Sequence, residues 1–209
     1  MSEKTPNLDD AYALKTAQDV TALYENWAHS YDVGFSDSQG YQLPNVVARA
    51  FVAAGGKGPV LDVGAGTGLV AEQLARVGVT PIDALDLSVD MLDVARNKQI
   101  YRNILVADVT KPISGSAEDY AGIISAGTFT HGHVGFEGLL PLLNITRPAA
   151  VFALSVNLKH HEAADFAAGF EGLAGQIADL RTHDVRIYDD RAAAPNRQDL
   201  ARIVTFTKV

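Results

Sequence analysis

Three glycines alternate with small residues in the segment whose chemistry is easiest to interpret. The chain reads Val-Leu-Asp-Val-Gly-Ala-Gly-Thr-Gly over residues 60–68, so an apolar run ends at Gly64, Gly66 and Gly68. From Val70 onward, apolar residues recur at helical spacing. A strand, a tight turn and a helix in this order open a Rossmann-type βαβ unit. The sequence therefore predicts a ligand that lies against bare backbone at the start of a helix.

Acidic residues end the next two expected strands. Asp86 lies 18 residues beyond Gly68, and its carboxylate can accept hydrogen bonds from both hydroxyls of a ribose. The same charge would repel a 2′-phosphate, which disfavours NADP. A place in the helix cap is the alternative, but Ser88 already serves as the cap. Asp108 stands at the corresponding place in the third strand, where a plain turn residue is the alternative.

Two histidines follow the fourth expected strand, on a loop that also contains Gly132. His131 and His133 are two positions apart, so in an extended loop they face opposite sides and at most one reaches a site. We take His131 as the candidate general base, with a hydrogen bond within the loop as the alternative. No Asp, Glu or Cys with ligand spacing accompanies them, so we expect no metal site.

An aromatic group stands near the start of the chain. Trp27 and Tyr31 are four positions apart and share a helix face, and Tyr24 lies one turn earlier. An aromatic face beside a cation stabilises it by about 0.5–2 kcal/mol, so this segment can close over a positively charged ligand. The alternative for Trp27 is packing of the helix onto the sheet.

The glycine segment resembles the S-adenosylmethionine (SAM) loop of class I methyltransferases. Asp62, two residues before Gly64, completes the pattern D-x-G-x-G-x-G. Leu69 stands where the dinucleotide fingerprint requires its third glycine, which counts against an NAD-linked oxidoreductase. Ala65 replaces the cysteine that is common at that place in the family, and both residues are small.

Two further blocks resemble one branch of this family. Residues 127–134 read Gly-Thr-Phe-Thr-His-Gly-His-Val, and residues 24–32 read Tyr-Glu-Asn-Trp-Ala-His-Ser-Tyr-Asp. Both are similar to blocks in the Williams–Beuren-syndrome-region methyltransferase and its bacterial relatives. The resemblance extends over about residues 20–209 and implies methyl transfer from SAM to a small-molecule acceptor by in-line displacement. A protein acceptor, an NAD-dependent oxidoreductase and a non-catalytic SAM-binding module are the alternatives.

The resemblance also implies which residues contact the cofactor. Leu87 would press on one adenine face, Met91 would close the pocket, Asp108 would receive the adenine amino group and Val109 would flank the ring. The hydroxyl of Tyr31 would reach the methionyl carboxylate. The full expected set is Trp27, Tyr31, Asp62, Gly64, Ala65, Gly66, Asp86, Leu87, Met91, Asp108, Val109 and Ser125.

The elements that must position these residues alternate between strands and helices. We expect strands over residues 60–63, 82–87, 104–107, 121–125, 151–156, 185–188 and 203–206. We expect helices over residues 16–33, 43–54, 68–77, 89–97, 136–143 and 162–180. This alternation predicts an α/β fold with a doubly wound sheet. The resemblance implies a Rossmann-like, seven-stranded, mostly parallel sheet in the order 3-2-1-4-5-7-6, with the last strand antiparallel and helices on both faces.

Length and composition limit the remaining possibilities. The 209 residues fit one methyltransferase domain over 16–209, with a helical lid at 16–54, a core at 55–209 and a frayed tail at 1–15. The net charge of −8 disfavours nucleic acid as a partner. The chain has no cysteine, which excludes disulfides. With no recognisable signal peptide or membrane span, we expect a cytoplasmic protein with no membrane partner.

Overall fold

Seven strands form one mixed sheet in the order β3-β2-β1-β4-β5-β7-β6. The strands are β1 (Val60–Val63), β2 (Ile82–Asp86), β3 (Ile104–Val106), β4 (Tyr120–Phe129), β5 (Thr146–Asn157), β6 (Ile177–Arg186) and β7 (Leu200–Lys208). The computed structural model describes residues 19, 22–23, 25, 27–113 and 119–209. Neighbouring strands from β3 to β5 pair in parallel, whereas β7 runs antiparallel to both β5 and β6. The predicted fold class and strand order are confirmed.

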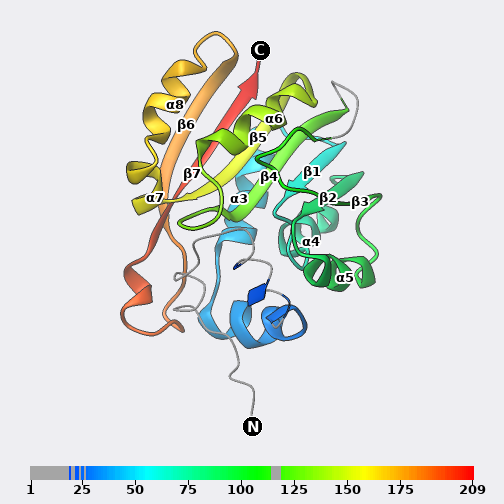
Figure 1. Ribbon diagram of the computed structural model, residues 1–209, viewed down its shortest axis with the longest axis vertical. Coiled ribbons are helices and arrows are strands. Elements are labelled where there is room, and N and C mark those ends of the chain that lie inside the picture. Colours follow the sequence, from blue (N-terminus) through cyan, green and yellow to red (C-terminus); the bar gives the residue numbers. More distant parts are fainter. Residues whose placement is uncertain (1–18, 20–21, 24, 26, 114–118) are drawn as a thin grey trace.

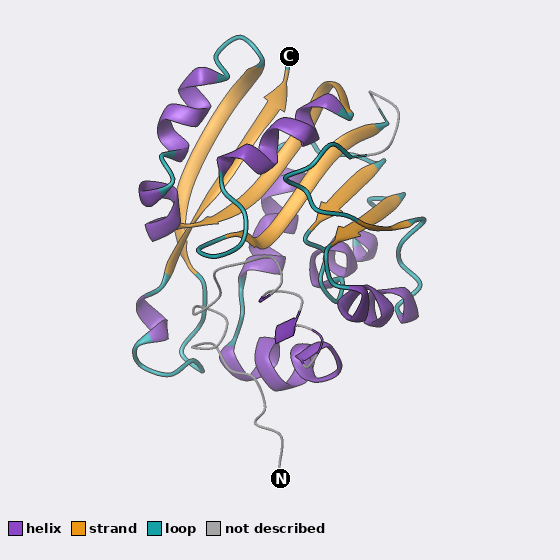
Figure 2. Ribbon diagram, in the orientation of Figure 1, coloured by secondary structure: helices purple, strands orange, loops and turns teal. Residues whose placement is uncertain are grey.

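Helices cover both faces of this sheet (Figure 2). They are α3 (Leu43–Ala53), α4 (Leu69–Arg76), α5 (Val89–Asn97), α6 (Leu139–Asn144), α7 (Leu158–Ala163) and α8 (Phe166–Gly172). Short helical turns are η1 (Ala28–Ser30), η2 (Tyr31–Asp37), η3 (Phe136–Gly138) and η4 (Asn196–Gln198). In the view of Figure 1, α6 and α8 lie in front of the sheet and α3 lies behind it.

The strand residues alternate between two apolar clusters, one on each face. Val60 packs with Phe51 of α3 and Leu74 of α4. Leu61, the next residue, packs instead with Leu142 of α6. Because successive side chains point to opposite faces, a strand covered on both sides needs a continuous apolar run. Three of the four residues of β1 are apolar and meet this requirement, and the exception, Asp62, is buried with a hydrogen bond from the Tyr101 hydroxyl.

The carboxyl ends of β1, β2 and β4 meet at one edge of the sheet. The helical turns η1 and η2 lie beyond this edge, in the lower part of Figure 1. The α3 helix begins with proline at its first turn, as predicted. Ser88 caps α5, since its hydroxyl accepts a hydrogen bond from the Met91 amide at 3.3 Å. The proline and the serine cap thus mark where α3 and α5 begin near this edge.

The predicted helix over residues 162–180 is wrong. The chain forms α7 and α8 and then enters β6 at Ile177. Asp165 interrupts the helical path with a φ of +50°, and Gly175 has a φ of +87° after α8 has ended. The alanine-rich composition favours helix, but pairing of β6 with β7 overrides this preference. Because the prediction extended the helix to residue 180, it placed the sixth strand only at residues 185–188, whereas β6 begins at Ile177.

Other boundaries differ less. The predicted helix over 16–33 falls partly on undescribed residues, and its described end continues through Gly34 to Asp37 as η2. The predicted tail at residues 1–15 lies outside the described residues. β4 continues to Phe129, four residues beyond the predicted end, with a register shift after Ser125. The division into lid and core stays a prediction.

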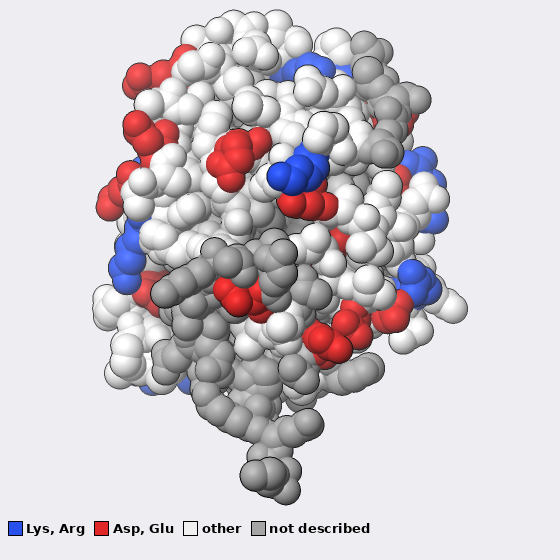
Figure 3. All heavy atoms as spheres, in the orientation of Figure 1, with Lys and Arg blue, Asp and Glu red and all other residues white. Residues whose placement is uncertain are grey.

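The surface carries mixed charge. Figure 3 shows Lys and Arg side chains scattered singly over the visible face among acidic ones. Among the described residues, every helix is too short or too polar to cross a lipid bilayer.

Candidate functional site

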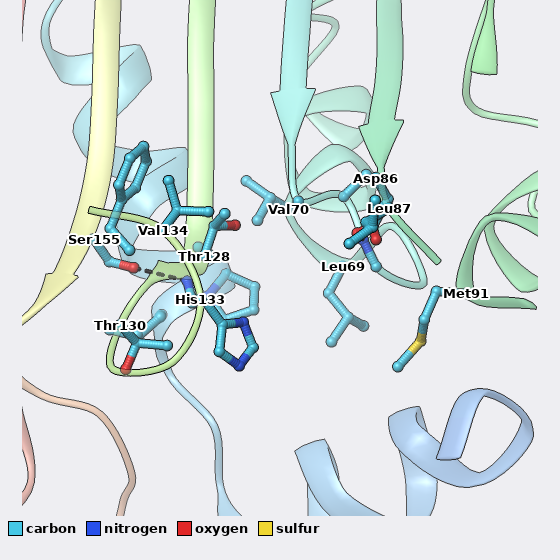
Figure 4. A pocket seen from close by; sticks show the side chains of 18 of the residues that line it. Leu69, Val70, Asp86, Leu87, Met91, Thr128, Thr130, His133, Val134 and Ser155 are labelled. Atoms are coloured by element: carbon cyan, nitrogen blue, oxygen red, sulfur yellow. Dashed lines mark hydrogen bonds between the residues drawn. The ribbon is translucent and has the colours of Figure 1, made fainter. Parts of the chain in front are cut away.

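A cavity of about 280 Å³ opens at the carboxyl ends of β1, β2 and β4. Ligands of open α/β sheets bind at this edge. The following predicted site residues line the cavity: Trp27, Tyr31, Gly64, Ala65, Gly66, Asp86, Leu87, Met91, Asp108 and Val109. Three others, Asp62, Ser125 and His131, do not line it. In Figure 4, Asp86 and Leu87 extend from the end of one strand, with Met91 and His133 on opposite sides of the opening.

The glycine loop is held by backbone hydrogen bonds to the end of β2. The amides of Gly64 and Ala65 both donate to the Leu85 carbonyl, at 2.8 and 3.1 Å. Gly64, Gly66 and Gly68 have φ values of +63°, +53° and +94°, a region that other residues rarely adopt. The alternating glycines are therefore required by the backbone path of the loop.

Asp86 joins this loop to the start of α5. Its Oδ2 accepts the Gly66 amide at 2.7 Å, and its Oδ1 accepts the Ser88 amide at 2.9 Å. Burial raises the pKa of Asp86, while the amides of Ser88, Gly66 and Leu87 oppose the rise by stabilising the carboxylate. Each oxygen has a second lone pair, so the same carboxylate can also receive hydroxyl donors from the cavity.

Asp108 and Val109 complete the side of the cavity next to β3. The Asp108 Oδ1 accepts hydrogen bonds from the Thr110 hydroxyl at 2.6 Å and the Thr110 amide at 2.9 Å. The Thr110 hydroxyl is the main cause of a lowered pKa for Asp108, so the group is a carboxylate near neutral pH. Val109 is buried beside it.

Residues 27–37, here called the lid segment, cover the cavity. The Trp27 side chain is only 2% exposed, and its ring meets the Tyr31 ring edge to face at a centroid distance of 5.3 Å. Both residues line the cavity as well as packing against the fold. The two roles that the sequence left as alternatives for Trp27 are therefore compatible.

The loop after β4 brings His133, and not His131, to the cavity. The His133 amide donates to the Thr130 carbonyl at 3.1 Å, and Gly132 has a φ of +76°, so the loop turns back on itself. His131 lies on the exposed side with its ring 5.0 Å from that of His160. Of these two histidines only His133 lines the cavity, and the catalytic role expected of His131 stays a prediction. Burial, followed by repulsion from His160, lowers the pKa of His133 to about 4.

Comparison with known proteins finds similarity to methyltransferases. The chain matches a methyltransferase domain family over residues 60–140, from β1 into the start of α6. The chain contains the glycine loop, Asp86 and Asp108 within this matched region. It is 26% identical over 153 residues to human Methyltransferase-like protein 27, a match that covers 68% of this chain and 62% of the relative. The matched region thus spans less than two thirds of that protein's length.

Solved structures share the fold at low identity. Magnesium protoporphyrin IX methyltransferase from Synechocystis PCC 6803 with bound SAM has a TM-score of 0.65 and 17% identity, covering 98% of this chain and 100% of the other. The [4+2]-cyclase SpnF has a TM-score of 0.69 and 14% identity, covering 93% and 97%. The solved structures of that magnesium protoporphyrin IX methyltransferase contain bound SAM in one case and bound S-adenosylhomocysteine in another.

The cavity wall fits that cofactor. A Cβ built on Gly66 meets no heavy atom within 4 Å, so the backbone presents open space to a ligand. By contrast, a Cβ on Gly64 would lie 1.9 Å from the Thr128 hydroxyl oxygen. The two glycines therefore have different reasons to lack a side chain. Gly66 leaves room in the cavity, and Gly64 allows β4 to approach the loop.

Asp62 and Ser125 lie behind the glycine loop and do not line the cavity. Asp62 is almost fully buried and accepts a hydrogen bond from the Tyr101 hydroxyl at 2.7 Å. The Ser125 hydroxyl donates to the Val63 carbonyl at 2.7 Å and so connects β4 to the end of β1. Both side chains support the loop from below, a role that the sequence pattern alone does not separate from ligand contact.

Several cavity residues escaped the sequence prediction. They are mostly polar or aromatic and include Tyr41, Thr128, Thr130, Ser155, Asn157 and Tyr188. Ser155 and Asn157 stand at the end of β5, and the Ser155 hydroxyl accepts the Gly127 amide at 3.0 Å (Figure 4). The rule that identified Asp86 and Asp108 as strand-end residues would have found these two. Tyr41 and Tyr188 meet through an isolated antiparallel bridge between distant parts of the chain, for which no local signal exists.

Replacing the two glycines by alanine separates folding from cofactor binding. Gly64→Ala is expected to lower the free energy of unfolding by about 3 kcal/mol, because a strained φ adds to the clash with Thr128. Gly66→Ala is expected to cost only about 1–2 kcal/mol from its φ, yet to weaken S-adenosylhomocysteine binding roughly tenfold by narrowing the cavity. Urea denaturation and titration calorimetry measure the two effects. Unchanged binding by Gly66→Ala would contradict the assignment of the loop.

Asp62 makes the stability of the fold depend on pH. Burial, then repulsion from Asp86, raises its pKa from 3.8 to about 7 against the hydrogen bonds from Tyr101 and the Ala71 amide. The folded state therefore holds a proton that the unfolded state releases. The contribution of Asp62 to the free energy of unfolding therefore falls as pH rises from about 4 to about 7, by up to about 1.4 kcal/mol per pH unit.

Asp62→Asn removes this titration but keeps an oxygen that can accept the hydrogen bond from the Tyr101 hydroxyl. The variant's free energy of unfolding, relative to the wild-type protein, is therefore expected to rise between pH ~5 and pH ~7. Urea denaturation across this range checks the slope. Asp93→Asn, at an exposed ion pair with Arg96, provides the control and should show no such trend. A constant difference for Asp62→Asn would show that Asp62 ionises normally in the folded protein.

Proposed function

We propose that this protein transfers a methyl group from SAM to a small-molecule acceptor by in-line displacement. One observation carries the proposal: a single cavity joins the glycine loop, Asp86 and Asp108 to a second group of polar residues, Thr130, His133 and Asn157. The first side suits a cofactor with a ribose and an adenine. The second side can receive an acceptor. Their continuity would allow the two reactants to meet away from water.

The chain's own residues contribute mainly by binding and orientation. When bound, SAM supplies a methyl group on a positively charged sulfur. The Asp86 carboxylate would receive ribose hydroxyls, and the Gly64–Gly66 backbone would hold the methionyl part. The rings of Trp27 and Tyr31 line the cavity and would stabilise the positive charge. His133 is neutral near pH 7 and can hold a proton that an acceptor releases.

We further assign the chain to the branch that contains the Williams–Beuren-syndrome-region methyltransferase. The blocks at residues 24–32 and 127–134 support this assignment. Residues 27–32 of the first block belong to the lid segment, and the second block includes part of the loop that carries His133; both contribute residues to the cavity wall. Similarity to human Methyltransferase-like protein 27 also favours a methyltransferase of this kind.

Cofactor binding is tested first by thermal unfolding with S-adenosylhomocysteine or NADH. At about 100 times a ligand's Kd the folded state gains about 2.7 kcal/mol, which for this length raises Tm by roughly 5–11 °C. We expect the rise with S-adenosylhomocysteine. A rise with NADH alone would overturn the proposal in favour of an oxidoreductase.

Turnover needs a separate test, because the same fold occurs in a protein named a cyclase. Methyl-labelled SAM is incubated with the enzyme and either the low-molecular-weight fraction or the protein fraction of a cell extract. Label in the small-molecule fraction supports the proposal. Label in the protein fraction alone would mean that the acceptor is a protein. No transfer to either fraction would favour a SAM-binding module without turnover.

A further inference from the structure

Asp32 in the lid segment contacts two elements that border the cofactor cavity. The Thr67 hydroxyl donates to its Oδ1 at 2.5 Å, and the Lys98 ammonium donates to its Oδ2 at 2.6 Å. Lys98 also lies 3.4 Å from a carboxylate oxygen of Glu72. These four residues, here called the Asp32 cluster, connect segments that are 35 and 66 positions apart in the chain.

Each member of the Asp32 cluster belongs to a different element. Asp32 is in η2, Thr67 is in the glycine loop, Glu72 is in the first turn of α4 and Lys98 caps the end of α5. Both α4 and α5 begin at the cavity edge, directly after the glycine loop and after Asp86 respectively. One carboxylate therefore ties the lid segment to the elements that form the cofactor side of the cavity.

The degree of burial makes these contacts stronger than ordinary surface ion pairs. The Lys98 side chain is 17% exposed and that of Asp32 is 31% exposed, while Thr67 is buried. Exposed pairs contribute little because water screens them. Charge-assisted hydrogen bonds in partly dry surroundings are shorter and roughly twice as strong as neutral ones. The Asp32 cluster can therefore influence where the lid segment lies.

The position of Asp32 in the chain links this effect to the cavity. It directly follows Tyr31, and Trp27 lies about one helical turn earlier, so fixing Asp32 fixes both rings that line the cavity. On the other side, Thr67 directly follows Gly66, whose amide is bound to Asp86. The contact between Asp32 and Thr67 thus joins the lid segment to the part of the glycine loop that lines the cavity.

We propose that Asp32 is a positioning residue that holds Trp27 and Tyr31 over the cofactor through Thr67 and Lys98. The inference rests on the proposed function for its effect on SAM, but the placement of the lid segment can be measured without any ligand. If the lid segment leaves the cavity part of the time, the apparent Kd of the cofactor rises in proportion to the fraction of molecules that lose the closed arrangement.

The chain contains a single tryptophan, Trp27, so fluorescence reports on the lid segment directly. In the ligand-free protein, Asp32→Asn is expected to shift Trp27 emission to longer wavelength and to increase its quenching by iodide, because the buried ring becomes exposed to water. The same variant is expected to raise the Kd of S-adenosylhomocysteine roughly tenfold in titration calorimetry. Asp37→Asn, an exposed acid of the same η2 turn, is the matched control and should change neither.

A double-mutant comparison separates positioning from general damage. In a Lys98→Met background, Asp32→Asn is expected to change the Kd much less than in the wild-type protein, because the ion pair is already lost. Equal factors in both backgrounds would overturn the proposed link. If Asp32→Asn does not fold, Lys98→Met alone carries the fluorescence and binding tests, since Lys98 is outside the cavity.

The outcomes also distinguish this inference from the proposed function. Wild-type emission and quenching in both Asp32→Asn and Lys98→Met would overturn the role of the Asp32 cluster. A red shift together with weaker cofactor binding supports it. If the wild-type protein fails to bind S-adenosylhomocysteine while Asp32→Asn still exposes Trp27, the proposed function falls, and the tie between the lid segment and the loop stands.

Discussion

Asp86→Asn is expected to weaken S-adenosylhomocysteine binding by about 100-fold. The carboxylate has two roles at once: it accepts the Gly66 and Ser88 amides, and it faces the cavity where ribose hydroxyls would lie. Hydrogen bonds to a charged group contribute about 1.5–3 kcal/mol each, and two of them with ribose account for roughly 100-fold or more in affinity. Titration calorimetry on the folded variant measures the loss.

The substitution also has a structural consequence that must be measured beside the affinity. The amide group of asparagine presents N–H donors to one of the two backbone amides, so a hydrogen bond is replaced by a repulsive contact. We expect the free energy of unfolding to fall by about 1–3 kcal/mol. Asp90→Asn, in the first turn of the same α5 helix, is the control and should keep both affinity and stability. An Asp86→Asn variant that binds within threefold of wild type would show that ribose is held elsewhere.

The sequence predicted this side of the site well because its signals are local. A glycine path, an acid at a strand end and a serine cap each act within a few residues, and Gly66, Asp86 and Ser88 meet as the pattern requires. Backbone conformation and strand ends follow from neighbouring residues. Such features are readable without knowledge of distant contacts.

The other side of the cavity depends on contacts between distant segments. Tyr41 and Tyr188 meet although they are far apart in the chain, and the alanine-rich segment at 162–180 becomes partly strand only because β7 is available to pair. Asp62 and Ser125 fit the family pattern in sequence but point behind the loop. Whether a side chain faces a ligand or its own backbone is decided by tertiary packing, which a linear pattern does not contain.

The two histidines illustrate this limit and lead to the last prediction. His133→Ala is expected to lower kcat for methyl transfer by roughly 10²–10⁴-fold if the acceptor must lose a proton, because a positioned base contributes this much. His131→Ala, two residues away and exposed, is expected to keep near wild-type kcat. The initial rate of S-adenosylhomocysteine formation, with the acceptor fraction that supports turnover, measures both.

The pH dependence adds a second criterion. Because the pKa of His133 is lowered to about 4, its neutral, proton-accepting form persists as pH falls to that value. The wild-type rate is therefore expected to lack an acidic limb attributable to this histidine between pH ~5 and pH ~8. Loss of rate in His131→Ala alone would make His131 the general base, as the sequence first indicated. Full activity in both variants would mean that the acceptor reacts without a histidine base, and that the cavity contributes by orientation and exclusion of water.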